Sequence, residues 1–187
     1  HDYDKFVRAY LGTLLSVDDS VGRLYAALEA TGQLNRTVIV FTSDNGFALG
    51  EHGRVDKRTM YEESIRVPLI VRYPPLIPKR TVINEMVLNL DLAPSVIDLG
   101  GGQPLTAIDG QSWKPLLAGN PTGWRKSWLY FYNYEKEFPY TPNVRGVRTA
   151  GWKYIYYPSG EGTPGRYAAE LYNLAIDPQE TQNLIAD

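Results

Sequence analysis

Residues 37–46 read Thr37-Val38-Ile39-Val40-Phe41-Thr42-Ser43-Asp44-Asn45-Gly46. The first six are β-branched or aromatic, and a strand that is apolar on both faces is typical of a parallel sheet covered by helices. The sequence then turns polar at the point where such a strand ends. Because ligands of open α/β sheets bind beyond the carboxyl ends of the strands, this stretch predicts an α/β fold with a site at residues 43–46.

The neighbouring segments complete the predicted α/β part. Apolar residues recur every three or four positions over residues 3–30, which predicts a long amphipathic helix that ends near Gly32. Residues 67–73 read as a second buried strand, which we expect to run parallel to the first. The interval 81–102 predicts a short strand followed by a helix over Leu92–Leu99. Residues 1–102 are therefore interpreted as part of a parallel-sheet α/β domain.

The composition changes in the second half of the chain. Residues 103–127 hold turn formers and scattered apolar residues and are interpreted as a connector. Residues 128–187 are interpreted as a small antiparallel-sheet subdomain. Aromatic residues alternate along residues 128–132 and 152–157, a third run lies at residues 143–149, and Ala150-Gly151 suits a tight hairpin turn. Asp177, Pro178 and Glu180 predict a last helix, with an N-cap, a proline in the first turn and a capping box.

Composition excludes several classes of function. The 19 basic and 21 acidic residues among 187 give a formal net charge of −2, which argues against a nucleic-acid partner. No apolar run approaches the roughly 20 residues needed to cross a bilayer, so we expect no membrane partner. The chain has no cysteine, which excludes disulfides, thiolate metal sites and a cysteine nucleophile.

The residues with useful chemistry lie just after the first strand. Asp44 and Asn45 offer hard oxygen ligands that suit Ca²⁺ or Mg²⁺. His52, within Gly50–Gly53, could act as an acid, a base or a hydrogen-bond donor, and Lys57 could hold an anion. Together they indicate metal-assisted handling of an anionic ester. Taken alone, Asp-Asn-Gly is equally a common turn tripeptide, so both interpretations stay open on these residues.

The wider string resembles the sulfatases, hydrolases of sulfate esters in the alkaline-phosphatase superfamily. The resemblance covers nearly the whole chain in order: 15–23, 37–46, 50–53, 57–71, 91–99, 144–155 and 170–180. It implies that Asp44 and Asn45 are metal ligands for Ca²⁺ or sometimes Mg²⁺, and that Lys57 binds the sulfate group. It places His52 near the substrate, and it implies that Tyr61, Glu62 and Arg66 support the lysine.

The same resemblance shows which parts of the chemistry the sequence lacks. The nucleophile of the family is a formylglycine made from Cys or Ser in a Cys/Ser-x-Pro/Ala-x-Arg motif, and no such motif occurs here. Asp18-Asp19 does not replace the family's other acidic metal ligands, because neighbours in a helix point about 100° apart. We therefore expect roughly the last two-fifths of a sulfatase, inactive alone, with an exposed sheet edge through which copies could associate.

The resemblance also suggests substrates and leaves two alternatives. Sulfated sugars or aryl sulfates are the expected substrates, with N-acetylglucosamine-6-sulfate in glycans as the leading one, and a periplasmic or secreted location is typical of the family. A phosphodiesterase or phosphonate hydrolase is the first alternative, although Asp-His is more frequent there than Asp44-Asn45. The second is a non-catalytic glycan-binding module that uses aromatic residues at period-2 spacing: Trp128, Tyr130, Tyr132, Tyr134, Trp152, Tyr154 and Tyr156.

Overall fold

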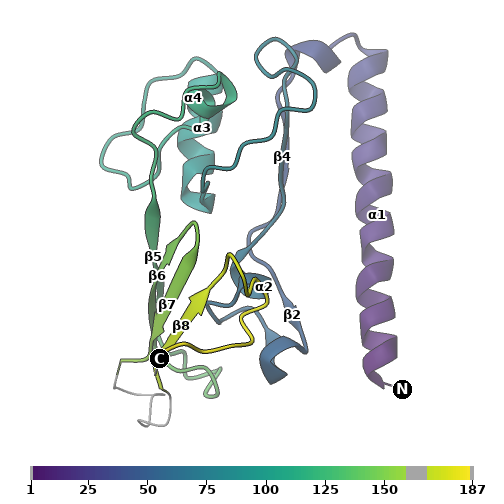
Figure 1. Cartoon of the computed structure of the whole chain (residues 1–187). Coiled ribbons are helices and arrows are strands. Elements are labelled where there is room, and N and C mark those ends of the chain that lie inside the picture. Colours follow the sequence, from purple (N-terminus) through teal and green to yellow (C-terminus); the bar gives the residue numbers. More distant parts are fainter. Residues whose placement is uncertain (1, 159–167, 186–187) are drawn as a thin grey trace. The chain divides into compact units, whose positions relative to one another are not determined.

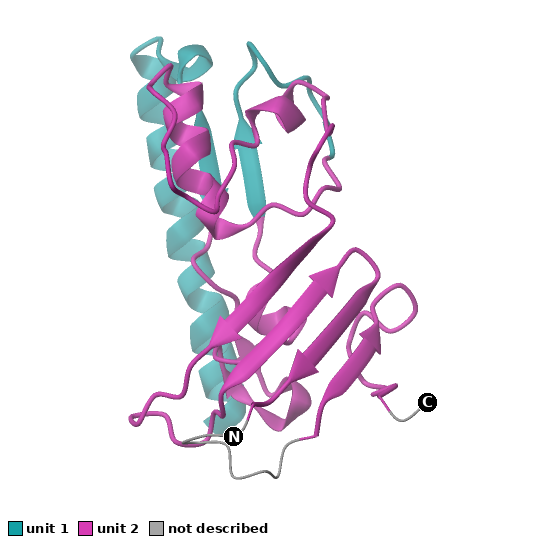
Figure 2. Cartoon of the chain, turned by 90° about the vertical axis from the view of Figure 1, so that its left-hand side faces the viewer, with its two compact units in different colours: residues 1–41, 69–82 teal, residues 42–68, 83–187 magenta. Residues whose placement is uncertain are grey.

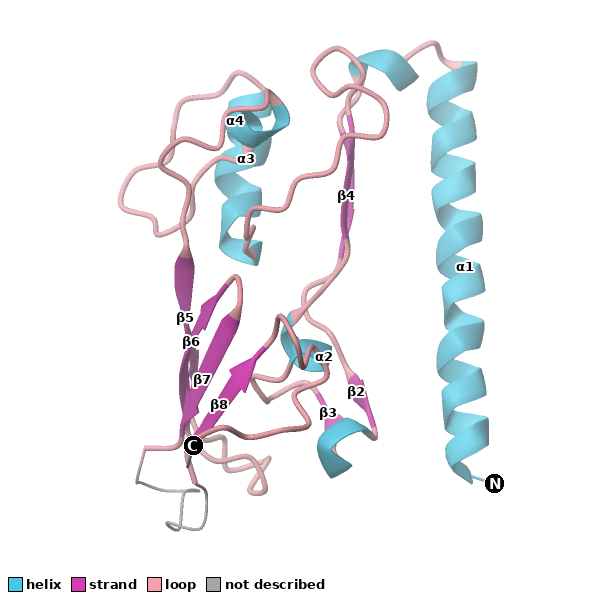
Figure 3. Ribbon diagram, in the orientation of Figure 1, coloured by secondary structure: helices cyan, strands magenta, loops and turns pink. Residues whose placement is uncertain are grey.

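The computed structural model describes residues 2–158 and 168–185 (Figure 1). The helices are α1 (Asp2–Ala30), α2 (Glu62–Ile65), α3 (Leu92–Leu99) and α4 (Lys114–Leu117), with 3₁₀ turns at Leu34–Arg36, Glu51–Gly53 and Asn89–Asp91. The strands are β1 (Ile39–Thr42), β2 (Ala48–Leu49), β3 (Val55–Asp56), β4 (Leu69–Arg72), β5 (Ser127–Tyr132), β6 (Val144–Thr149), β7 (Trp152–Tyr156) and β8 (Glu170–Asn173) (Figure 3).

The chain forms two compact units, coloured separately in Figure 2. One holds residues 1–41 and 69–82, and the other holds residues 42–68 and 83–187. The units are interleaved along the sequence, and the proposed domain limits at residues 102 and 127 stay a prediction. None of the described helices is both long and apolar enough to cross a membrane.

The first unit contains the predicted helix and the paired strands. Helix α1 ends before Gly32, whose φ of +66° suits the left-handed turn that closes a helix. Strands β1 and β4 are hydrogen-bonded neighbours, which confirms their pairing, while their parallel direction stays a prediction. The Arg72 guanidinium donates to Leu34 O over 2.7 Å and to Asn35 Oδ1 over 2.9 Å. Helix α1 buries none of its described residues and Ile70 is 62% exposed, so the expected uncovered apolar surface is present.

The second unit contains the predicted antiparallel sheet. Its strand order is β5-β6-β7-β8, every pair is antiparallel, and β6 joins β7 by the expected hairpin at Ala150-Gly151. Residues alternate between a buried and an exposed face. The exposed face carries large apolar side chains: Leu129, Phe131, Trp152, Tyr154 and Tyr156. Trp128 pairs through Arg148 with Lys153 and so belongs to the buried face. The aromatic residues proposed for sugar stacking therefore divide between opposite faces, because side chains alternate along a strand.

The helix predicted at Asp177 is not formed. The Asp177 carboxylate accepts hydrogen bonds from the Thr181 and Gln182 backbone N–H groups, over 3.1 and 2.9 Å, but it does so in a turn. Glu180 does not fold back on a helix as a capping box requires. Its φ is +54° and its side chain is fully buried against Lys153. The Glu180 carboxylate, which a capping box would have needed, is therefore paired with Lys153 instead.

A different segment covers the buried face of the sheet. The core there consists of Met60, Val144, Ile155, Tyr172 and Leu174. Met60, next to α2, fits over Gly146, where a Cβ atom would lie only 2.1 Å from the Met60 sulfur. The segment that follows β3 thus packs on the sheet in the place where a terminal helix was predicted.

The short strand predicted after residue 81 is absent, and the predicted connector contains a helix. Residues 103–127 include α4 and bury Trp113, Leu116 and Leu117. Residues 81–88 form no strand, because their backbone groups bond to side chains instead. Met86 O accepts from Trp124 Nε1 over 2.8 Å, and the Leu88 N–H donates to Asp91. The buried Asp91 carboxylate, paired with the Arg125 guanidinium, is the centre of this packing.

Candidate active site

The loop after β1 presents oxygen atoms in a form that fits a hard cation. Asp44 is exposed, and its Oδ1 accepts the Asn45 backbone N–H over 2.9 Å. The Asn45 side-chain nitrogen donates to Gly46 O over 2.8 Å, which leaves its amide oxygen unengaged within the described part of the chain. A carboxylate oxygen and an amide oxygen of neighbouring residues are the ligand types that Ca²⁺ and Mg²⁺ prefer. The residues present therefore fit the expected metal.

Two distant segments hold this loop. The Gly46 N–H donates to Ser64 O over 2.9 Å, and the Asn89 side chain donates to Asp44 O. A Cβ atom at Gly46 would lie 2.0 Å from Glu63 O, so only glycine fits against the α2 segment. The position of Asp44 and Asn45 thus depends on residues nearly 20 and 45 positions downstream.

Gly46→Ala should displace this loop. The clash is with the backbone, which cannot turn aside as a flexible side chain can, so the Gly46–Ser64 hydrogen bond should break. We expect a destabilisation of about 1–3 kcal/mol, measured by urea unfolding, together with changed amide chemical shifts at Asn45 and Ser64. Gly53→Ala is a comparison in which the added methyl group meets open space and only the φ of +66° is strained. Unchanged shifts at Asn45 and Ser64 in Gly46→Ala would contradict the close packing described here.

Lys57 is brought toward the same loop by a short hairpin. Strands β2 and β3 pair with Ala48 opposite Asp56. The loop after β1 leads into β2 at Ala48, and Lys57 leaves β3 at the same end of the hairpin. Arg58 takes up the negative charge of Asp56 through hydrogen bonds of 2.5 and 2.7 Å. The Lys57 side chain is exposed and has no ion-pair partner among the residues that the structure describes. Its ammonium group is therefore available for an anion.

His52 points away from solvent and contacts the α2 segment. Its φ of +54° is in the left-handed region, its ring stacks on Tyr61 at 3.8 Å between centroids, and its Nε2 lies 3.3 Å from Glu63 Oε2. The His52 side chain is only 14% exposed. The described contacts of this histidine are thus with protein groups, and its role near the substrate stays a prediction.

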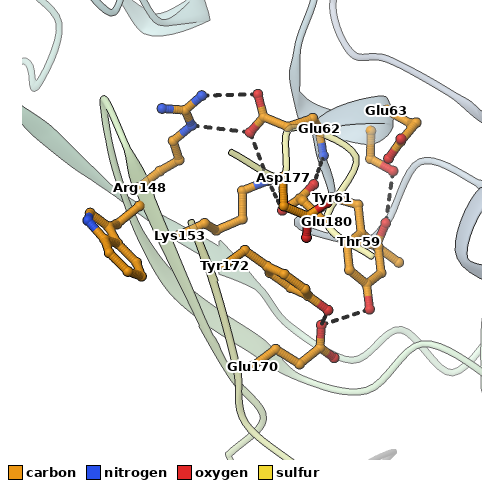
Figure 4. Close-up of polar contacts among 12 residues, drawn as sticks. Thr59, Tyr61, Glu62, Glu63, Arg148, Lys153, Glu170, Tyr172, Asp177 and Glu180 are labelled. Atoms are coloured by element: carbon orange, nitrogen blue, oxygen red, sulfur yellow. Dashed lines mark hydrogen bonds and ion pairs between the residues drawn. The ribbon is translucent and has the colours of Figure 1, made fainter. Parts of the chain in front are cut away.

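Glu62 of α2 belongs to a network of charged side chains with Arg148 on β6, Lys153 on β7 and Glu180 (Figure 4). The Arg148 guanidinium donates to both Glu62 oxygens over 3.1 Å, and the Lys153 ammonium lies 2.8 Å from Glu62 and 2.6 Å from Glu180. Burial opposes ionisation of Glu62, but the hydrogen bonds from Arg148 and the charge of Lys153 outweigh it, so the pKa of Glu62 is lowered. Arg66, expected from the sequence to support the lysine, is exposed and makes no side-chain bond to these charged groups within the described residues.

A second network holds Tyr61. The phenol groups of Tyr61, Tyr157 and Tyr172 all donate to the Glu170 carboxylate, over 2.8, 2.6 and 2.7 Å. Burial and the negative charge of Glu170 raise the pKa of Tyr61 to about 12. Tyr61 and Glu62 are themselves held by residues of the C-terminal sheet that sequence reasoning did not identify, and their support of Lys57 stays a prediction. The alternation of β7 could have revealed Lys153, because it places this lysine on the same face of the strand as the buried Ile155.

One other group of side chains resembles a metal site but is already paired. Ligand atoms of His52, Glu63 and Glu180 lie within 4.8 Å of one another. One Glu180 oxygen, however, lies 2.6 Å from the Lys153 ammonium, and the other accepts the Glu62 N–H over 2.7 Å. A cation there would be repelled by the Lys153 ammonium, and only His52 and Glu63 would remain as ligands. The assignment of the metal to Asp44 and Asn45 therefore stays the prediction.

The charge network predicts a particular acid sensitivity. Because the folded-state pKa of Glu62 is below its ordinary value of 4.5, its contribution to stability is full above that value and is lost as the pH falls through the folded-state pKa. Between about pH 6 and pH 3, unfolding midpoints should therefore fall more steeply in the natural chain than in Glu62→Gln. Parallel pH profiles for the two chains, measured with urea, would contradict this assignment.

Comparisons with known proteins add to this geometry. Residues 50–187 match the family described as N-sulphoglucosamine sulphohydrolase, C-terminal. The chain is 40% identical over 188 residues to the N-acetylglucosamine-6-O-sulfatase of Bacteroides thetaiotaomicron, over 97% of this chain and 32% of that protein. It is 41% identical over 119 residues to the extracellular sulfatase SULF-1 homolog of Drosophila melanogaster, over 63% of this chain and 11% of that protein. The chain thus spans a third or less of the length of these relatives.

Solved structures share the fold. The structure of BT4656 in complex with its substrate D-glucosamine-2-N,6-O-disulfate matches 99% of this chain and 37% of that chain, with a TM-score of 0.90 and 38% identity. The phosphonate monoester hydrolase of Agrobacterium radiobacter matches 91% of this chain and 35% of that chain, with a TM-score of 0.75 and 29% identity. These neighbours have the α/β and antiparallel-sheet arrangement found here.

Proposed function

Because the chain belongs to the sulfatase family of the alkaline-phosphatase superfamily, we propose that it supplies the metal-binding loop and the sulfate-binding lysine of a sulfuric ester hydrolase. The observation that carries the proposal is the loop after β1. There an exposed carboxylate and an amide oxygen lie at one end of a hairpin, and a lysine follows the same end. Within residues 2–158 and 168–185, the amide oxygen has no hydrogen-bond partner and the lysine has no ion-pair partner.

Each residue has a distinct part in the proposed site. Asp44 and Asn45 hold a divalent cation, Ca²⁺ in the first instance and Mg²⁺ as the alternative. When bound, such a cation neutralises charge on the sulfate group. The Lys57 ammonium binds the sulfate group and stabilises the charge that develops on it. Tyr61 and Glu62 hold the segment that follows Lys57.

The nucleophile of the proposed reaction is not among these 187 residues. The sequence has no cysteine and no serine in the Cys/Ser-x-Pro/Ala-x-Arg pattern from which the family makes formylglycine. Without it the covalent step has no attacking group. We therefore propose that this chain, tested by itself, does not turn over sulfate esters.

A sulfated sugar is the proposed substrate, with N-acetylglucosamine-6-sulfate first among the possibilities. The support is the identity to an N-acetylglucosamine-6-O-sulfatase and the likeness to a structure that holds a disulfated glucosamine as its substrate. A periplasmic or secreted location is proposed with it, since one relative is an extracellular sulfatase. Association of two copies through the open β1–β4 sheet edge is also part of the proposal.

A phosphonate monoester hydrolase is the second candidate, because an enzyme of that class shares the fold at a TM-score of 0.75. The asparagine at residue 45 favours the sulfatase, since histidine is more frequent at that position among the alternative relatives. A glycan-binding module is less well supported, because the aromatic residues of the sheet lie on opposite faces.

A composite enzyme tests this function. Its N-terminal two thirds come from the Bacteroides thetaiotaomicron relative, and this chain replaces the matching last third of that protein. With Ca²⁺ present, the composite should hydrolyse N-acetylglucosamine-6-sulfate faster than a phosphonate monoester, and this chain alone should hydrolyse neither. A folded composite that prefers the phosphonate monoester would favour the second candidate. Sustained hydrolysis by this chain alone would show that the nucleophile has been misjudged.

A further inference from the structure

The metal-binding loop packs against the α2 segment, and α2 is itself bound by a residue from the C-terminal end of the chain. The Gly46 N–H is bound to Ser64 O, and Glu63 O leaves no room for a side chain at Gly46. Any shift of residues 62–64 would therefore move Gly46 and, with it, the adjacent Asn45. Helix α2 has only four residues and no side-chain cap from Tyr61, so it is not stable by itself.

Glu180 supplies the cap that α2 lacks. One of its carboxylate oxygens accepts the Glu62 N–H over 2.7 Å, although the two residues are 118 positions apart. The other oxygen lies 2.6 Å from the Lys153 ammonium, which also lies 2.8 Å from the Glu62 carboxylate. Glu180 and Lys153 are both fully buried. A carboxylate at a helix start satisfies a backbone N–H that would otherwise lack a partner.

The backbone at Glu180 indicates that this contact is specific. Its φ of +54° is uncommon for a residue other than glycine, and its side chain is fully buried against Lys153. A residue kept in such a conformation is held by the surrounding structure. Here the surroundings are Lys153 on the sheet and the first turn of α2.

We propose that Glu180 is a positioning residue for the metal-binding loop: it caps α2, and α2 sets the place of Gly46, Asn45 and Asp44. The inference rests on the proposed function for the identity of the metal ligands, and on the structure for the chain of contacts. The C-terminal turn thus takes part in the geometry of the site without touching metal or substrate.

Amide hydrogen exchange of this chain tests the inference, with Glu180→Ala, Glu180→Gln and the natural sequence compared. In Glu180→Ala the Gly46 amide should exchange about tenfold faster or more, relative to the Ile155 amide in the central ladder of the sheet. Glu180→Gln should restore part of the protection, since its amide oxygen can still accept the Glu62 N–H. If Glu180→Ala fails to fold, the comparison of Glu180→Gln with the natural chain takes its place, with a smaller change in the same direction.

The control removes a carboxylate elsewhere in the same unit. Asp98→Asn loses a 2.9 Å ion pair with Lys114 and should leave the ratio of Gly46 to Ile155 exchange unchanged. A second measurement is broadening of the Asn45 side-chain amide signal by Mn²⁺, which should need a higher Mn²⁺ concentration in the Glu180 variants.

The inference is overturned if Gly46 and Ile155 exchange faster by the same factor in the Glu180 variants, since that is a uniform loss of stability. It is also overturned if neither rate changes. Exchange is measured without catalysis, so an inactive composite enzyme would count against the proposed function and leave this test intact.

Discussion

Lys57→Ala in the composite enzyme is expected to lower kcat by about 10²–10³-fold, the usual effect of removing one group that stabilises charge in the transition state. The Lys57 ammonium has no ion-pair partner in the described part of the chain, so its removal leaves no protein charge unpaired. The bound metal should therefore remain, as measured by metal content after gel filtration. Lys79→Ala, which changes another surface lysine, is a matched control and should keep full activity.

Asp44→Ala should behave differently, because it removes a proposed metal ligand. Metal content and turnover should fall together, and added Ca²⁺ should restore part of the turnover. If Lys57→Ala loses the metal as well, the separate roles assigned to Lys57 and Asp44 are wrong. Full activity in Asp44→Ala would place the metal elsewhere.

Lys153→Met should produce the largest loss of stability, about 3–5 kcal/mol, which is typical when one partner of a buried ion pair is removed. The substitution keeps much of the side-chain volume but leaves two buried carboxylates, Glu62 and Glu180, without their shared cation. The free energy of unfolding from urea titration measures the loss. Lys114→Met is a suitable comparison, because its ion pair with Asp98 is 41% exposed on both sides and should contribute much less.

The double variant Lys153→Met/Glu180→Gln distinguishes charge from packing. If the cost in Lys153→Met comes from an uncompensated carboxylate, removing the charge of Glu180 should recover part of it. A double variant whose loss is the sum of both single losses would show that lost packing, and not charge, dominates.

The local sequence determined much of this protein. The periodicity of residues 3–30 predicts α1, the apolar runs predict β1 and β4, and alternation predicts the strands β5, β6 and β7, because helix and strand impose their own spacing on apolar side chains. The motif residues Asp44, Asn45 and Lys57 could be named because the family resemblance depends on short, contiguous stretches of sequence.

Tertiary structure alone decided the rest, and the reason is that it depends on contacts between distant residues. Asp177 and Glu180 have the local pattern of a helix start, yet the buried ammonium of Lys153 binds the Glu180 carboxylate and the segment forms a turn. A charge pair buried in a low-dielectric interior outweighs a helix cap at the surface, and sequence spacing contains no information on which partners will meet. The hydrogen bond from Gly46 to Ser64 and the capping of α2 by Glu180 likewise join residues that only the fold brings together.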